Sequence, residues 1–71
     1  MDIIKISVFI SNNGKSIEYC IDTRQERQVY NDKTIPGNIV EFMNKQANKN
    51  NIIYHEKDLK TGKETFVYSF I

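Results

Sequence analysis

The chain has 71 residues, of which 39% are hydrophobic and 27% are charged, with a single proline and a formal net charge of +1. This length allows one small domain and excludes a cofactor-binding domain beside a catalytic one. The ordinary globular composition argues against disorder, and the interleaved charges do not predict strong nonspecific attraction to nucleic acid or to an anionic membrane. We therefore expect a single α+β domain over residues 1–71.

Cysteine content and the N-terminal pattern indicate the compartment. Cys20 is the only cysteine, so the chain forms no internal disulfide and no thiolate zinc cluster. The start, MDIIKISVFIS, alternates and carries Asp2 and Lys5, which is typical of a strand and unlike a signal peptide. No stretch has the length needed to cross a bilayer. We expect a cytoplasmic protein with no cofactor, no metal and no membrane contact.

The first third of the chain predicts a hairpin. Residues 3–10 and 16–23 alternate in hydrophobicity, as strands with one buried face do. The expected buried face of this hairpin holds Ile4, Ile6, Val8, Ile10, Ile17, Tyr19 and Ile21, and the opposite face holds Ile3, Lys5, Ser7, Phe9 and Cys20. Asn13-Gly14 favours a two-residue type I′ turn, in which both residues have positive φ.

The turn sequence NNGKS, residues 12–16, also resembles the end of a phosphate-binding loop. That motif requires a glycine five positions before Gly14, where this chain has Phe9, and it joins a strand to a helix. Strand-like residues stand on both sides of NNGKS, so a hairpin turn is the better interpretation.

The middle of the chain predicts one helix. After Asp22 the alternation fades, and the pair Val29-Tyr30 is either a short extra strand or a loop anchor. Within residues 35–51, helical spacing of apolar residues predicts a helix. Its expected features are Ile39, Phe42 and Met43 on the buried face, Thr34 or Asn38 as the cap, and a Glu41–Lys45 ion pair.

A second hairpin is predicted at the end of the chain. Its strands are residues 51–57 and 64–71, with Gly62 in a left-handed conformation in the loop. Phe66, Tyr68 and Phe70 are expected on one face. The order is thus β-β-α-β-β, with one helix packed on a mostly antiparallel four-stranded sheet. One helix of about three turns cannot cover both faces of such a sheet, so an open face and two edges remain.

The residue types that carry catalysis do not form a recognisable site. His55 and Glu56 are adjacent on a predicted strand and therefore point to opposite faces, so either a cross-strand partner or plain solvent exposure is expected for His55. Cys20 has no base at a readable spacing. The carboxylates Asp22, Glu26 and Asp32 are interleaved with basic residues and do not resemble a calcium loop. We expect no catalytic residue and no enzymatic activity.

Two functional hypotheses remain. The first is a non-enzymatic protein-binding module, such as a bacteriophage or mobile-element inhibitor of a host defence enzyme, with homodimerisation through a sheet edge or face as a further expectation. Its candidate contact residues are Phe9, Cys20, Arg24, Arg27, Tyr30, Tyr54 and Tyr68. The alternative is a small nucleic-acid-binding regulator that uses basic hairpin loops, with Arg24, Arg27, Lys57, Lys60 and Lys63 as its candidate contacts.

Overall fold

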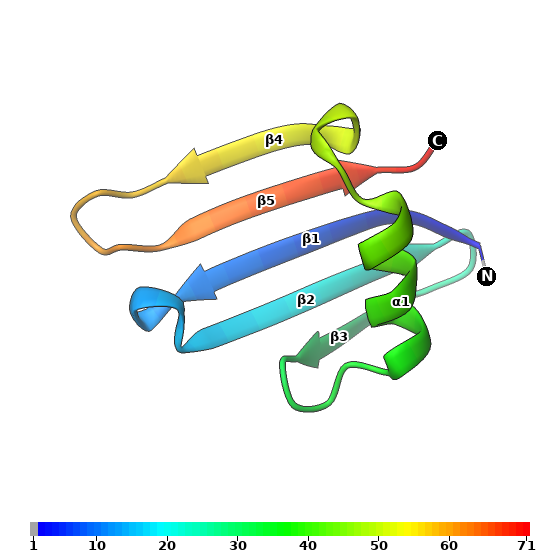
Figure 1. Cartoon of the computed structure of the whole chain (residues 1–71), viewed down its shortest axis with the longest axis horizontal. Helices are drawn as coiled ribbons and strands as arrows, with labels where there is room; N and C mark the ends of the chain where they lie inside the picture. The colour runs from blue at the N-terminus through cyan, green and yellow to red at the C-terminus, as the bar shows by residue number, and fades with distance from the viewer. Residues whose placement is uncertain (1) are drawn as a thin grey trace.

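The computed structural model describes residues 2–71, which form one five-stranded antiparallel sheet with a single helix on one face (Figure 1). The strands are β1 (Ile3–Ser11), β2 (Ser16–Thr23), β3 (Arg27–Asn31), β4 (Ile52–Lys57) and β5 (Glu64–Ser69), in the order β3-β2-β1-β5-β4. The helix is α1 (Gly37–Gln46), and two short 3₁₀ turns are η1 (Asn12–Gly14) and η2 (Lys49–Asn51). The small α+β class is confirmed, whereas the four-strand count and the β-β-α-β-β order are wrong.

The additional strand is β3, which settles the interpretation of Val29-Tyr30. A turn held by Thr23 reverses the chain after β2, because the Thr23 hydroxyl accepts hydrogen bonds from the backbone N–H groups of Gln25 and Glu26. The chain then pairs back along β2, with Val29 opposite Cys20. Since β3 is an edge strand with mostly exposed residues, its sequence carries little alternation.

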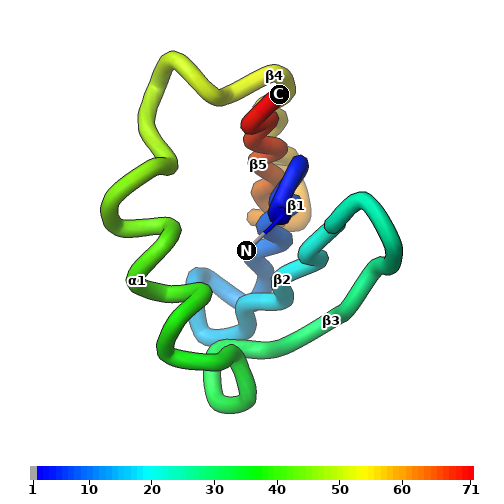
Figure 2. The backbone as a smooth tube through the Cα atoms, turned by 90° about the vertical axis from the view of Figure 1, so that its right-hand side faces the viewer, coloured from blue at the N-terminus to red at the C-terminus, as the bar shows by residue number. Residues whose placement is uncertain are grey.

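Helix α1 lies across one face of the sheet, and the opposite face has no helix over it (Figure 2). Pro36 occupies the N-cap position, and no side chain caps the helix there. Thr34 instead accepts a hydrogen bond from the Asn31 backbone N–H, so the expectation of a Thr34 or Asn38 cap is wrong. The expected ion pair is confirmed, with Lys45 Nζ 2.9 Å from Glu41 Oε1. None of the helices in residues 2–71 has the length and apolarity that crossing a membrane requires.

The core lies between α1 and the central strands. Its buried residues are Ile3, Ile6, Val8, Ile21 and Ile39. A register irregularity between Ile3 and Lys5 interrupts the alternation, so Ile3 is buried in this cluster and Ile4 is only half-buried. The expectation that Ile4 belongs to the core and Ile3 to the other face is therefore wrong. The expected packing of Ile10, Ile17, Phe42 and Met43 against the core is confirmed, and Phe66, Tyr68 and Phe70 pack there as well.

Both hairpin turns use the left-handed residues that the sequence predicts. Asn13 and Gly14 have φ values of 56° and 86°, and the Lys15 N–H donates to the Asn12 carbonyl at 3.1 Å. The connection has four residues instead of two, because pairing ends at Ser11 and Ser16. In the second turn Gly62 has a φ of 73°, as expected.

The two turns lie side by side at one end of the sheet, and this contact leads to a prediction. A Cβ atom at Gly62 would lie 3.3 Å from Asn13 Oδ1, in a conformation that L-residues avoid. We expect Gly62→Ala to lower the free energy of unfolding by about 1–2 kcal/mol, measured by urea denaturation. Gly37→Ala is the matched control, because a Cβ at Gly37 has no neighbour within 4 Å. Equal urea midpoints for the two variants would contradict this assignment.

Candidate functional site

The face of the sheet opposite α1 is organised in three rows that cross the strands. Directly opposed residues of antiparallel strands share a face, so the pairing register defines these rows. The cationic row is Arg27, Asp22, Lys5 and Ser69; the middle row is Val29, Cys20, Ser7, Val67 and Tyr54; the acidic row is Asn31, Glu18, Phe9, Thr65 and Glu56. We call this surface, which crosses all five strands, the open face.

The open face has a floor of small side chains and larger apolar side chains around it. Ser7 and Cys20, at its centre, are each 8% exposed. Around them Phe9, Val29 and Tyr54 are 42%, 57% and 47% exposed. Figure 2 shows the β2–β3 hairpin bending away from α1, toward the side of the open face. The result is a shallow apolar surface that residues 2–71 leave uncovered.

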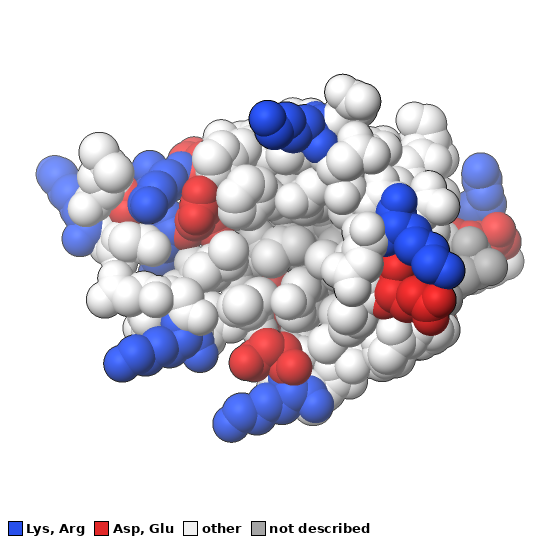
Figure 3. All heavy atoms as spheres, viewed as in Figure 1, with Lys and Arg blue, Asp and Glu red and all other residues white. Residues whose placement is uncertain are grey.

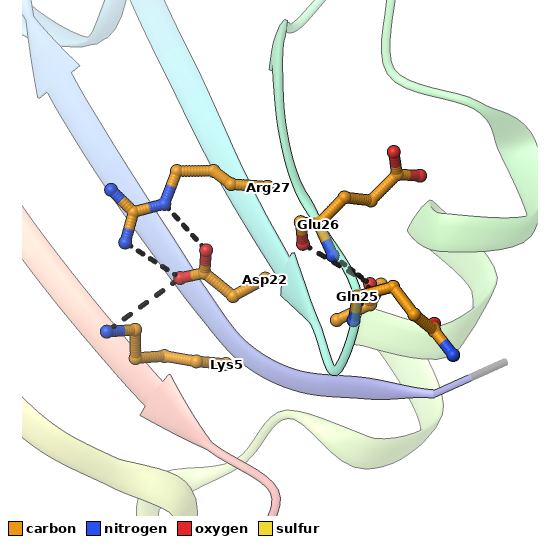
Figure 4. Close-up of polar contacts among 6 residues, drawn as sticks. Lys5, Asp22, Gln25, Glu26 and Arg27 are labelled. Atoms are coloured by element: carbon orange, nitrogen blue, oxygen red, sulfur yellow. Dashed lines mark hydrogen bonds and ion pairs between the residues drawn. The ribbon is translucent and has the colours of Figure 1, made fainter.

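The cationic row is held by a shared carboxylate (Figure 4). Arg27 Nε donates to Asp22 Oδ1 at 2.6 Å, Arg27 Nη2 donates to Asp22 Oδ2 at 3.4 Å, and Lys5 Nζ lies 3.8 Å from the same Oδ2. The hydrogen bond to Asp22 raises the pKa of Arg27. The Asp22 side chain is 11% exposed, compared with 39% for Lys5 and 62% for Arg27. Because two exposed cations share one buried anion, this end of the open face is locally positive.

The acidic row differs from the cationic row in the sign of its charge. Tyr54 Oη donates to Glu56 Oε2 at 2.5 Å, and this hydrogen bond raises the pKa of Tyr54. Glu18 stands beside Phe9 in the same row, and both line a hollow together with Lys63. The row itself carries the carboxylates of Glu18 and Glu56 and no basic residue. The open face is therefore bipolar, with its positive end at Lys5 and Arg27 and its negative end at Glu18 and Glu56.

Cys20 lies on the floor of the open face, in an environment that lowers the reactivity of its thiol. Burial raises the pKa of its thiol above the ordinary value, so less thiolate is present at any given pH. We expect iodoacetamide to alkylate Cys20 in the native protein more slowly than in the urea-unfolded chain, with the pH midpoint of the native rate displaced to higher pH. Mass spectrometry of quenched samples measures both rates. A native midpoint at or below that of the unfolded chain would contradict this description.

The single histidine lies on the other face of the sheet. His55 Nε2 is 2.6 Å from Glu64 Oε2 on the neighbouring strand, and the ring stacks on Phe66 with centroids 4.2 Å apart. A cross-strand partner for His55 in place of Glu56 is thus confirmed. Among residues 2–71, His, Cys, Asp and Glu side chains form no group of three or more that could hold a metal ion.

The structure brings together only part of the predicted contact set. Phe9, Cys20, Arg27 and Tyr54 lie on the open face. Tyr30 and Tyr68, the two other aromatic candidates, pack against the core beneath α1, away from this face. Arg24 lies in the turn between β2 and β3. Lys5, Asp22 and Val29 also lie on the open face and were not among the predicted contact residues. Alternation had placed Lys5 on this face, whereas Val29 joins it only through the register of β3.

The basic residues of the nucleic-acid alternative are divided between two ends of the molecule. Arg24 and Arg27 lie at the β2–β3 turn, whereas Lys57, Lys60 and Lys63 lie at the β4–β5 turn, and β1 and β2 extend between these ends. On the face that carries α1, basic and acidic side chains are mixed around the periphery, and the centre is uncharged (Figure 3). The five residues therefore form no continuous basic surface.

A separate hollow of ≈ 520 Å³ lies at the C-terminal end of α1. Its lining includes Phe42, Phe70, Ile53, Asn50 and Asn51, without a charged side chain. The amide of Asn51 is already used, since Nδ2 donates to the Ser69 carbonyl and Oδ1 accepts from the Asn48 N–H.

Comparison with known proteins found no matching family model, no matching curated protein and no matching solved structure.

Proposed function

We propose that this chain is a non-enzymatic protein-binding module and that its contact surface is the open face. The observation that supports this is the exposure of Phe9, Val29 and Tyr54 on a face that α1 leaves uncovered. Grouped apolar side chains of this kind on a small domain mark interaction sites, because their burial by a partner is favourable. The interface centre would be apolar, with charged residues at both ends, as in many protein–protein interfaces.

The sheet edges are weaker candidates than the face. Edge strand β3 has only five residues and begins with Arg27. Edge strand β4 has a register irregularity between Ile52 and Tyr54 and ends in Glu56 and Lys57. Short length, irregular pairing and charged side chains are the features by which proteins disfavour strand addition at an edge.

The charge distribution supports a protein partner over nucleic acid. Phosphate contacts require cations that are free to neutralise the backbone, and binding then weakens steeply with salt. On the open face, Arg27 and Lys5 are both engaged by Asp22, and the far end carries Glu18 and Glu56. A surface with negative charge at one end would repel a phosphate backbone laid along it.

Affinity capture tests this proposal. The tagged chain is incubated with host lysate with and without nuclease, and the retained material is analysed by mass spectrometry and by nucleic-acid staining. We expect one protein at near-equal amount to the bait, unaffected by nuclease. If that protein is a host enzyme whose activity falls on binding, the chain is an inhibitor. Recovery of nucleic acid, with proteins lost on digestion, would contradict the proposal.

A further inference from the structure

The arrangement of charge on the open face points to its first occupant. We propose that a second copy of this chain covers the open face, through a two-fold axis that runs along the middle row. This inference rests on the proposed function, because it names a partner for the same surface.

A two-fold axis along the middle row reverses the strand direction of the second copy. The middle row then lies over the middle row of the second copy, and the cationic row of each copy lies over the acidic row of the other. Val29, Val67 and Tyr54 each lie over the same residue of the second copy along this row, with Val29 and Tyr54 at its two ends, and each charged contact occurs twice. An axis along the strands would instead place cationic row over cationic row.

The contacts in this arrangement are complementary. Asp22 and Glu18 both stand on β2, with Asp22 in the cationic row and Glu18 in the acidic row. Glu18 of each copy therefore lies above Asp22 of the other, between Lys5 and Arg27. The two cations exceed the charge of Asp22 by one unit, which the incoming Glu18 carboxylate neutralises. Lys5 lies above the Phe9 ring of the second copy, at a place suited to a cation–π contact.

The size of the face predicts a reversible dimer. Five strands spaced about 4.8 Å apart and three rows separated by about 6.6 Å give a patch of roughly 24 by 13–20 Å. This is at the small end of specific interfaces, below the roughly 800 Å² per partner that is usual. We therefore expect a weak dimer in exchange with the monomer.

Sedimentation equilibrium over a range of protein concentrations tests the proposal, together with two charge reversals. Glu18→Lys alone brings lysine against Lys5 and Arg27 of the second copy, and Lys5→Glu alone brings glutamate against Glu18. We expect each variant to associate at least tenfold more weakly than the wild type. An equimolar mixture of the two should recover dimer, because one contact keeps Glu18 beside Lys5, and in the other the introduced lysine lies beside the introduced glutamate and Asp22, which offset its repulsion from Arg27. Lys60→Glu, in the β4–β5 turn, is the matched control and should dimerise as the wild type does.

The outcomes separate this inference from the proposed function. A wild type that stays monomeric at all concentrations overturns the dimer, while the affinity capture still decides whether the chain binds another protein. A dimer that both reversals leave unchanged, or a mixture that stays monomeric although both variants are folded by circular dichroism, overturns the two-fold arrangement. If neither variant dimerises alone and their equimolar mixture does, the two-fold arrangement is supported.

Discussion

Phe9→Asp is expected to weaken binding of the captured partner protein by roughly 30-fold or more, which corresponds to the loss of an interface hot spot of about 2 kcal/mol. Phe9 lies on central strand β1, is 42% exposed, and is the largest apolar side chain of the acidic row. A carboxylate there removes the apolar contact and adds to the charge of neighbouring Glu18. Because the side chain is not part of the buried core, the fold should remain. Calorimetric titration of the partner with each variant measures the change.

Val40→Asp is the matched control for Phe9→Asp. Val40 is 38% exposed on α1, so the substitution adds the same charge to a similarly accessible apolar side chain away from the open face. Its partner affinity should equal that of the wild type. Equal losses for the two variants, with native circular dichroism for both, would show that the open face is not the contact surface.

Ile6→Ala is expected to lower the free energy of unfolding by about 2–5 kcal/mol, through lost burial and the cavity that remains. Ile6 is 0% exposed and is the largest fully buried side chain among the described residues. It lies on β1 beneath α1, in the same cluster as Ile21 and Ile39. A domain of this size has a total stability of only about 4–11 kcal/mol, so the variant should lose a large share of it.

Urea denaturation followed by circular dichroism measures the effect of Ile6→Ala. Ile53→Ala is its control, because Ile53 has the same side chain at 64% exposure and should change the stability by about 0.5 kcal/mol or less. If both variants unfold at the same urea concentration, the core does not lie where the structure places it.

Some elements were predictable from the sequence because burial imposes a strong periodic pattern. Alternation over β1 and β2 and the helical spacing of Ile39, Phe42 and Met43 follow from one-sided burial against a single core. The edge strand β3 was not predictable, because its side chains are mostly exposed and its alternation is correspondingly weak. The reversal of Ile3 and Ile4 also had no signal, since a register irregularity depends on the partner strand.

The candidate site was predictable only where it depended on alternation within one strand. Phe9 and Cys20 are on the face opposite the core for that reason. The contact of Asp22 with both Lys5 and Arg27 requires the register of three strands. Tyr68 was expected among the contact residues but packs against the core, although its strand was predicted. The sequence alone does not show which faces of the two hairpins lie on the same side of the sheet.

Hydroxyl-radical footprinting with mass spectrometry tests most directly whether the open face is the contact surface. The labelling of Phe9, Tyr54 and Leu59 is compared in the free chain and in the complex, either with the captured partner or in the concentrated dimer. Leu59, 88% exposed in the β4–β5 turn, is the internal reference. We predict that Phe9 and Tyr54 become protected while Leu59 does not. Unchanged labelling of Phe9 and Tyr54 in a formed complex would contradict the account.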